Sequence, residues 1–307
     1  MLYKMGEKKI YVRKTFLGNC RRLLEKIVPQ TTDLYKWLYL NAVRFSSKKR
    51  NERKKYLSFK YHTVDGCNLN CSGCSTFSPL VDNSFVDAKS FENDIKHITK
   101  LGYVEKMELI GGEALLHPNI LELIEISRKY IEKGELSLVT NGILLLKKDE
   151  KFWESCRKNK IGIKITPYPI KLDIDKILEF AEKYDVNLGY YYGGSKIHFC
   201  KYPLNMDGRG DMNKNFNRCD SSCCATLRDG KMYICCRTYS VKFFNEYYGQ
   251  EFKVLEKDYK DIYAVKDADE LLDFMCKATP FCRYCDLDKS KFGIPWGITK
   301  KEIGEWI

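Results

Sequence analysis

Three cysteines stand close together in the segment CNLNCSGC, where Cys67, Cys71 and Cys74 have the spacing C-x₃-C-x₂-C. Thiolates bind zinc and iron–sulfur clusters, so this spacing predicts a metal centre. Structural zinc sites usually have four protein ligands, which come from paired C-x₂-C turns and leave no coordination position open. This loop holds no fourth cysteine or histidine. Three thiolates on a [4Fe–4S] cluster leave one iron open to a substrate or cofactor. A triplet of buried or zinc-bound thiols is the alternative.

The chain holds 14 cysteines in 307 residues. No apolar stretch approaches the roughly 20 residues that a membrane-spanning helix needs. The start, MLYKMGEKKIYVRK, lacks the continuous hydrophobic region of a secretory signal. These features predict a cytoplasmic location, where thiols stay reduced. Clustered cysteines in that compartment indicate metal binding and not a disulfide framework.

The net charge of +12 is concentrated at the start, because residues 1–60 hold 17 Lys and Arg against 4 Asp and Glu. Segments 16–28 and 33–45 mix leucines and aromatic residues with cations at helical spacing. We therefore predict a basic helical N-terminal extension over residues 1–55. It either packs on the main domain with its lysines in water or contacts an acidic surface. No nucleic-acid-binding motif accompanies the charge, so no nucleic-acid partner is expected.

From residue 56 onward, strand and helix patterns alternate. Strands are predicted at 56–64, 104–112, 135–142, 161–166 and 186–192, and helices at 90–102, 119–134, 149–159 and 173–184. This alternation predicts right-handed βαβ units, and hence an α/β fold with a full or partial (βα)₆-type barrel over residues 56–205. Active sites of such sheets lie at the carboxyl ends of the strands, which is where the cysteine loop falls.

A C-x₃-C-x₂-C loop after the first strand of a βα barrel resembles the radical S-adenosylmethionine (radical SAM) enzymes. GGEALLHP (111–118) resembles the family's GGEP motif, and TNG (140–142) resembles a further active-site segment. The resemblance implies that the backbone of Gly111 and Gly112, together with Glu113, holds the amino group of SAM. It also implies that Asn141 faces the cofactor.

The sequence departs from the family pattern at two positions. Gly73 stands where an aromatic residue usually precedes the third cysteine, and Ala114 replaces the usual proline. The resemblance implies a SAM-binding [4Fe–4S] cluster that splits SAM into methionine and a 5′-deoxyadenosyl radical, which abstracts hydrogen from a substrate. It also implies a one-electron reductant as a partner, such as flavodoxin or ferredoxin.

After about residue 205 the alternation stops, and residues 206–307 are rich in cysteines and turns. Asp229-Gly230 between apolar runs predicts a hairpin. The later cysteines resemble the SPASM auxiliary domains of radical SAM enzymes and their shortened form, twitch. No cysteine follows Cys285, so the shortened form fits better. The resemblance implies one auxiliary [4Fe–4S] cluster held by Cys219, Cys235, Cys282 and Cys285. Such a module would be held by metal more than by its own core.

Other assignments remain open for these cysteines. A zinc ribbon also combines a hairpin with C-x₂-C. Cys236 could replace Cys235 as a ligand, Cys223 or Cys224 could replace Cys219, and Cys276 is a spare. Small buried apolar residues are the simplest interpretation of Cys20, Cys156 and Cys200. A cysteine that is not a metal ligand could instead donate a hydrogen atom from its thiol to a substrate radical.

The histidines, at positions 62, 97, 117 and 198, are expected to be structural. Tyrosines at 190–192 and the segment TPYP (166–169) lie at strand ends where a substrate could sit. The leading hypothesis is a radical SAM oxidoreductase acting on a hydroxylated small molecule such as a sugar or cyclitol. The second is a peptide-modifying enzyme that makes a crosslink or an epimer. It ranks lower because the N-terminal segment shows no strands of a peptide-binding domain. The non-enzyme alternative is a zinc-binding interaction protein.

Overall fold

A computed structural model describes residues 2–5, 8–11, 56–190, 199–219, 221–222 and 224–307. The helices predicted at 16–28 and 33–45 lie outside these residues. Strands β1 (Leu2–Met5) and β2 (Lys8–Tyr11) pair antiparallel, so the prediction of an N-terminal segment without strands is wrong for residues 2–5 and 8–11. In the described part of the chain, no helix has both the length and the apolar character to cross a membrane.

The centre of the fold is a parallel sheet. Its strands are β3 (Tyr56–His62), β4 (Tyr103–Ile110), β5 (Glu135–Thr140), β6 (Ile161–Ile165) and β7 (Leu188–Tyr190). They lie side by side in chain order, and each adjacent pair is parallel. The connecting helices are α3 (Ala88–Leu101), α4 (Ile120–Tyr130), α5 (Glu150–Lys158) and α6 (Ile174–Lys183). The α/β prediction is therefore confirmed.

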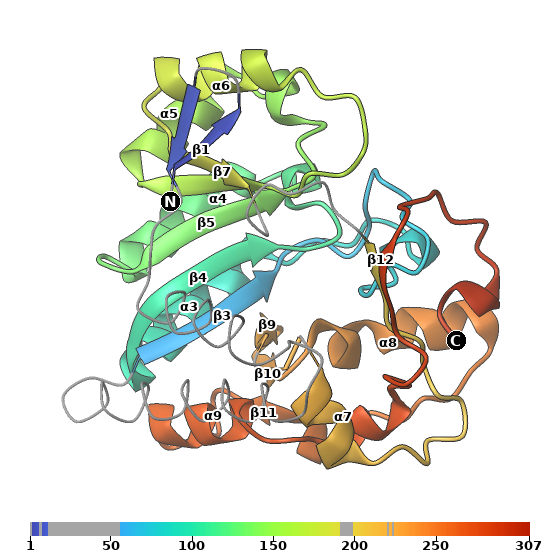
Figure 1. The fold of residues 1–307 in the computed structure, drawn as a ribbon. Helices are drawn as coiled ribbons and strands as arrows, with labels where there is room; N and C mark the ends of the chain where they lie inside the picture. The colour runs from blue at the N-terminus through green and yellow to red at the C-terminus, as the bar shows by residue number, and fades with distance from the viewer. Residues whose placement is uncertain (1, 6–7, 12–55, 191–198, 220, 223) are drawn as a thin grey trace.

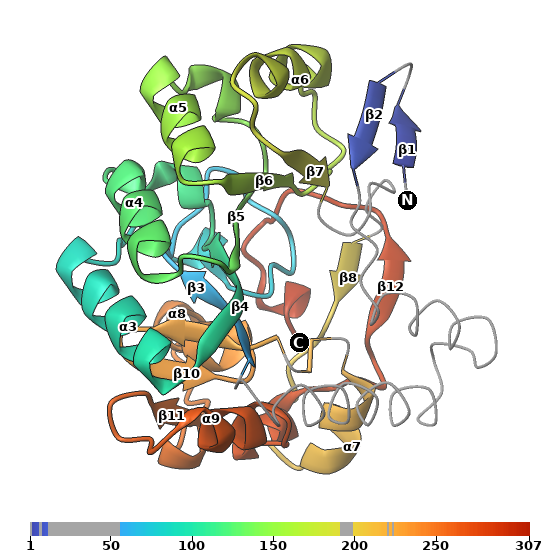
Figure 2. The ribbon, with the colours of Figure 1, turned by 90° about the vertical axis from the view of Figure 1, so that its left-hand side faces the viewer.

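The sheet curves into an open arc with these helices on its outer side (Figure 2). Three of the helices begin at an aspartate, Asp87, Asp149 or Asp173, whose carboxylate accepts a hydrogen bond from a backbone N–H of the first turn. These caps agree with the boundaries that the sequence pattern predicts.

A further parallel strand comes from the C-terminal part of the chain. β9 (Thr226–Arg228) pairs parallel with β3, and β10 (Lys231–Tyr233) and β11 (Tyr259–Asp261) continue the sheet antiparallel. Asp229 and Gly230 form the predicted hairpin turn, with φ of 51° and 72°. The buried carboxylate of Asp94 accepts hydrogen bonds from the Gly230 N–H at 2.9 Å and the Tyr61 hydroxyl at 2.7 Å. This contact fixes the hairpin against α3.

Further elements follow β7 in the chain. They are α7 (Met212–Arg218), α8 (Cys236–Tyr248) and α9 (Ala268–Met275), and a two-stranded sheet joins β8 (Phe199–Lys201) to β12 (Lys291–Ile294). Short 3₁₀ turns are η1 (Ser78–Leu80), η2 (Ala114–Leu116), η3 (Leu145–Lys147), η5 (Glu256–Asp258), η6 (Pro280–Tyr284) and η7 (Ile303–Glu305). The ribbon in Figure 1 shows the C-terminal tail, in red, beside the loop that follows β3.

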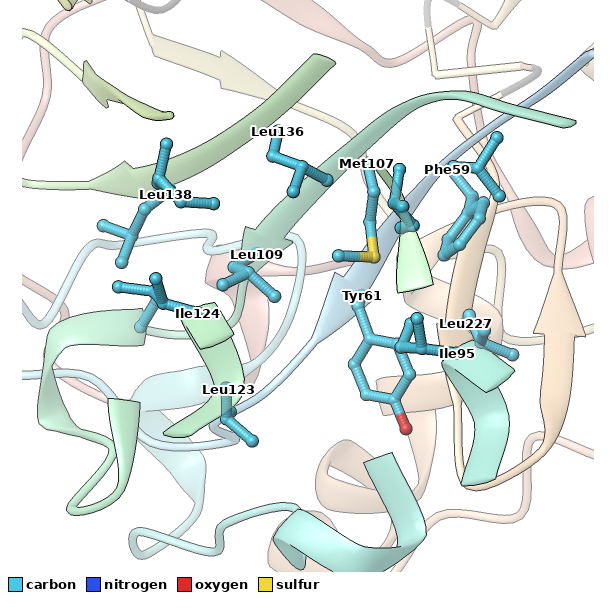
Figure 3. Close-up of a cluster of buried hydrophobic side chains, with 14 of the residues drawn as sticks. Phe59, Tyr61, Ile95, Met107, Leu109, Leu123, Ile124, Leu136, Leu138 and Leu227 are labelled. Carbon is cyan, nitrogen blue, oxygen red and sulfur yellow. The ribbon is translucent and has the colours of Figure 1, made fainter. Parts of the chain in front are cut away.

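The main apolar core lies between the sheet and its outer helices (Figure 3). Phe59 and Tyr61 of β3 pack there with Ile95 of α3, and Leu227 of β9 belongs to the same cluster. A second cluster, which includes Phe244 and Trp306, fills the C-terminal part. Both clusters cross the boundary near residue 205, so residues 206–307 share an apolar core with the rest of the fold. Whether metal holds this part more than the core does stays a prediction.

Candidate functional site

The cysteine loop follows β3 directly and is tightly folded on itself. The Cys67 sulfur accepts a hydrogen bond from the Leu69 N–H at 3.3 Å. Backbone bonds then run from the Cys71 N–H to the Leu69 carbonyl and from the Cys74 N–H to the Cys71 carbonyl. The loop thus turns at each cysteine and holds three thiols at the carboxyl end of the first parallel strand.

These thiols are largely shielded from water and lie near one another. Burial and the neighbouring Cys74 thiol raise the pKa of Cys71 to about 12. Burial, with smaller effects of Cys74, Glu113 and Cys71, also raises the pKa of Cys67 to about 12. A cationic metal core reverses this preference, because a metal-bound thiol loses its proton outright. The donor set therefore fits a positively charged centre.

The loop after β4 lies directly against the cysteine loop. Backbone hydrogen bonds join the Gly112 N–H to the Val64 carbonyl at 2.7 Å and the Glu113 N–H to the Gly66 carbonyl at 3.1 Å. A Cβ at Gly111 would lie 2.4 Å from the Val64 oxygen, and one at Gly112 would lie 2.0 Å from the Gly66 oxygen. Both positions therefore require glycine, because only a backbone without Cβ can approach so closely.

Glu113 is 1% exposed and joins the ends of β4 and β5. Its carboxylate accepts hydrogen bonds from the Thr140 hydroxyl at 2.7 Å and from the backbone N–H groups of Asn141 and Leu115 at 2.8 and 3.0 Å. Burial raises the pKa of Glu113 more than these bonds lower it. The carboxylate is thus engaged by protein donors, and its contact with the amino group of SAM stays a prediction.

Asn141 links this network to the cysteine loop. Its side-chain amide donates to the side-chain oxygen Oδ1 of Asn68 at 2.7 Å and lies 3.9 Å from the Cys67 sulfur. The structure therefore brings the predicted cysteine, glycine and TNG segments together at one edge of the sheet, where the sequence analysis expects a cofactor.

The comparisons with known proteins agree with this geometry. The model of the radical SAM superfamily matches residues 61–166. This range covers the cysteine loop, the GGE segment and the TNG segment. Residues 61–166 form a radical SAM domain.

Two curated relatives match over this region. A GTP 3′,8-cyclase of Trichodesmium erythraeum is 32% identical over 88 residues, 27% of each chain. A GTP 3′,8-cyclase of Aquifex aeolicus is 34% identical over 86 residues, also 27% of each chain. The match thus spans about a quarter of the length of these relatives.

Two solved structures are similar at low identity. BtrN in complex with AdoMet and 2-DOIA has a TM-score of 0.47 and 15% identity, over 75% of this chain and 93% of that one. Native anSMEcpe with bound AdoMet has a TM-score of 0.37 and 24% identity, over 43% of this chain and 42% of that one.

The cofactors of a radical SAM domain are a [4Fe–4S] cluster and SAM, and the residues described above fit them. Cys67, Cys71 and Cys74 provide three thiolates, each able to bind a different iron. Among the described residues, no group of three or more His, Cys, Asp or Glu side chains is placed so that it could hold one metal ion. The glycine pair leaves bare backbone beside the cysteine loop, so a ligand can approach it closely.

Some of the predicted auxiliary cysteines are neighbours in the structure, outside the radical SAM domain. Cys235 precedes α8, and a hydrogen bond with Cys236, burial and the nearby thiols of Cys219 and Cys285 raise its pKa well above the usual value. Cys282 and Cys285 bracket the end of η6, and Asn215 donates to both of their carbonyl oxygens, at 2.9 and 2.7 Å.

Two of the alternative auxiliary ligands, Cys224 and Cys236, lie near charged side chains. Hydrogen bonding from Cys235 and the charges of Lys60, His62 and Arg237 lower the pKa of Cys236. The Lys60 ammonium donates to the Cys224 sulfur at 2.6 Å. Lys60 of β3 thus influences both thiols, whereas Cys219 and Cys285 are the neighbours of Cys235. The choice of auxiliary ligands stays a prediction.

The other thiols considered as ligands or donors have different surroundings. Cys276 ends α9, Cys156 is buried in α5, and Cys200 lies in β8. Cys20 and Cys223 lie outside the described residues.

The histidines have structural surroundings where the structure describes them. His117 bonds the Val86 carbonyl at 2.9 Å and the Asn119 N–H at 3.1 Å. His62 lies 3.3 Å from the Asp65 carboxylate, and His97 packs on the ring of Tyr263 with centroids 4.6 Å apart. His198 lies outside the described residues, as do Tyr191 and Tyr192 of the predicted tyrosine segment.

The C-terminal tail also contributes to the site, and the sequence pattern does not reveal it. The indole N–H of Trp296 donates to the Cys71 sulfur at 3.1 Å, and that of Trp306 donates to the Cys74 carbonyl at 2.9 Å. Both tryptophans lie more than 200 residues after the loop, and no local pattern marks them as partners of the cysteines.

The inner face of the sheet carries an ion-pair network around the buried carboxylate of Glu108. The Glu108 carboxylate lies 2.9 Å from the ammonium groups of both Lys106 and Lys164, and Lys164 also pairs with Glu135. Burial alone would raise the pKa of Glu108, but Lys106, Lys164 and Lys60 outweigh it and bring the pKa to about 2.

This network predicts a pH-dependent loss of stability. Since the folded-state pKa of Glu108 lies below its ordinary value of 4.5, its contribution is complete above pH 4.5 and is lost as the pH falls toward 2. The loss is on the order of 3 kcal/mol. Urea unfolding between pH 6 and 3 should show a steeper decline for the native chain than for Glu108→Gln. Parallel declines would contradict the assignment.

Proposed function

We propose that this protein is a radical SAM oxidoreductase that oxidises a hydroxylated small molecule, such as a sugar or cyclitol, and carries one auxiliary [4Fe–4S] cluster. The observation that supports this most is the convergence of Cys235 with Cys219 and Cys285, and of Cys285 with Cys282. Four cysteine ligands leave no iron open for substrate, which suits a centre that accepts an electron.

The surroundings of these cysteines fit a negatively charged cluster. Arg237 is 5% exposed, and its guanidinium lies 3.9 Å from the Cys285 sulfur through Nη1. The Nε atom of Arg237 has no hydrogen-bond partner among the described residues, and its Nη2 group donates to the Tyr202 carbonyl. A buried guanidinium with a free N–H requires nearby negative charge, which four thiolates on iron and sulfide provide.

When bound, the SAM-binding cluster and SAM supply a 5′-deoxyadenosyl radical that removes one hydrogen atom from a substrate carbon. Oxidation of an alcohol to a carbonyl then requires the loss of one more electron and of the hydroxyl proton. The residues around the auxiliary cysteines would hold the acceptor of that electron. The proton passes to a base or to water.

Loss of auxiliary ligands is expected to separate SAM cleavage from substrate oxidation. In Cys282→Ala/Cys285→Ala, iron and sulfide should fall from about eight to about four atoms per chain. Cleavage of SAM to 5′-deoxyadenosine should persist, while formation of oxidised product falls at least about a hundredfold, which corresponds to about 2.7 kcal/mol. The measurement is anaerobic reconstitution, followed by metal analysis and product quantification with sugar and cyclitol candidates.

Cys156→Ala is the matched control, because it removes a buried thiol of α5 far from either cysteine group. Unchanged iron and sulfide in the double variant would overturn the auxiliary assignment. Zinc without labile sulfide in the native chain would support the zinc-binding interaction protein instead.

Two other substrates deserve direct tests. The relatives named GTP 3′,8-cyclase favour a nucleotide, and formation of 5′-deoxyadenosine that depends on added GTP would support it. Peptide modification gains support from β1 and β2, because the sequence argument against it assumed that residues 1–55 contain no strands. A product of altered mass from a candidate precursor peptide would establish that alternative.

The proposal also includes a reductant and a location. A flavodoxin or ferredoxin would supply the single electrons that the SAM-binding cluster needs. The cytoplasm, where thiols are kept reduced, suits a chain with this many clustered cysteines.

A further inference from the structure

The C-terminal tail, residues 295–306, lies against the cysteine loop of the radical SAM domain. We propose that this tail is an integral part of the cluster site, and that the indole N–H of Trp296 is a fixed hydrogen-bond donor to the Cys71 sulfur that sets the reduction potential of the SAM-binding cluster. Trp296 is thus a positioning residue, because it acts on the cluster through one of its ligands.

The contact that carries this inference is direct. The Nε1 atom of Trp296 lies 3.1 Å from the Cys71 sulfur. Cys71 is 4% exposed, so water has little access to compete for that sulfur. The Tyr168 ring lies 6.2 Å from the Trp296 ring and gives the indole an aromatic neighbour at the end of β6.

The backbone of the tail holds the indole in place. The Ser72 N–H donates to the Gly297 carbonyl at 2.8 Å, and the Thr299 N–H donates to the Asn70 carbonyl at 2.9 Å. Cys71 and Ile298 form an antiparallel bridge between these two bonds. The tail therefore pairs with the cysteine loop as a short strand would, and Trp296 comes just before the paired residues.

The end of the tail explains the glycine at position 73. Gly73 has φ of 67°, and a Cβ there would lie 3.1 Å from the Glu305 carbonyl oxygen. Trp306, which follows Glu305, is fully buried, and its indole N–H donates to the Cys74 carbonyl at 2.9 Å. The tail thus leaves little room for a side chain at position 73, just before Cys74. It also places Trp296 beside Cys71.

Hydrogen bonds to cluster sulfurs stabilise the more negatively charged, reduced state, so they raise the reduction potential. Removing the Trp296 N–H while keeping an aromatic ring should therefore lower the potential of the SAM-binding cluster. Because the bond also holds Cys71 in its position, the loss should speed the release of cluster iron to a chelator.

The experiment compares Trp296→Phe with Trp153→Phe in the full-length, anaerobically reconstituted protein. Trp153 is a matched control, because it is fully buried in α5 and its indole N–H has no hydrogen-bond partner among the described residues. The cluster that binds SAM is identified by the spectral change on SAM addition, and its potential is measured by an EPR-monitored redox titration.

We expect a shift of this midpoint to lower potential and faster iron release in Trp296→Phe, and neither change in Trp153→Phe. Native far-UV circular dichroism in both variants would show that the fold is retained. An unchanged potential together with an unchanged release rate in folded Trp296→Phe would overturn the proposal. These readouts do not require a substrate, so they are independent of the proposed reaction.

Discussion

Replacing Cys67, Cys71 or Cys74 by alanine is expected to abolish the cleavage of SAM. Each variant removes one of three thiolate ligands in a loop that has no fourth cysteine to take its place. The remaining two thiols cannot hold a cubane cluster with one open iron. Formation of 5′-deoxyadenosine under anaerobic reducing conditions should fall at least about a thousandfold, a loss of about 4 kcal/mol.

The metal content of these variants distinguishes loss of one cluster from general loss of structure. Each triplet variant should retain the auxiliary iron and sulfide, about four atoms of each per chain, and a native circular dichroism spectrum. Cys156→Ala should keep both clusters and full SAM cleavage, because that thiol packs in the core of α5. SAM cleavage at the native rate in any triplet variant would contradict the assignment.

Gly112→Ala adds only one methyl group, and we expect it to disrupt the cofactor site. The added methyl group would lie 2.0 Å from the Gly66 carbonyl oxygen and 2.8 Å from the Ser78 hydroxyl, so the two loops must separate. Separation breaks the bond from the Gly112 N–H to the Val64 carbonyl and moves the cysteine loop away from Glu113. We expect a stability loss of about 3 kcal/mol and SAM binding at least tenfold weaker, equivalent to about 1.4 kcal/mol.

Gly189→Ala in β7 is the control for this change, because a Cβ there meets no atom within 4 Å. Equilibrium dialysis with SAM and urea unfolding measure the two effects. Equal SAM affinity in Gly112→Ala and Gly189→Ala would show that the close approach of the two loops does not matter for the cofactor.

The sequence predicts most of the sheet because its signals are local. Alternation marks β4 and β5, and helices α3, α5 and α6 begin at aspartates that cap their first turns. The triplet and the GGE segment are equally local, and each follows a strand of the same parallel sheet. Their meeting at one edge follows from strand direction alone.

The remaining features depend on contacts between distant residues. β9 pairs with β3, although more than 160 residues separate them, and a three-residue strand has too little pattern to reveal its partner. Trp296 and Cys71 are separated by 225 positions. The neighbours Cys235 and Cys236 are equivalent in the sequence, but the fold gives them different surroundings, with the thiols of Cys219 and Cys285 near the first and the Lys60 ammonium near the second.

The surroundings of the predicted auxiliary cysteines also depend on the folded chain and not on spacing. Arg237 is one of many arginines in the sequence, and only the fold places its buried guanidinium beside Cys285. The same holds for Glu113, whose three protein donors become visible only when the ends of β4 and β5 are brought together.

EPR spectroscopy of the anaerobically reconstituted and reduced protein, with and without SAM, tests the open coordination position on the cluster most directly. The native chain should give a [4Fe–4S] signal whose g values shift when SAM is added, and the shift should be absent from Cys71→Ala. A reduced-cluster spectrum that SAM leaves unchanged, or a shift that survives the loss of Cys71, would contradict the account.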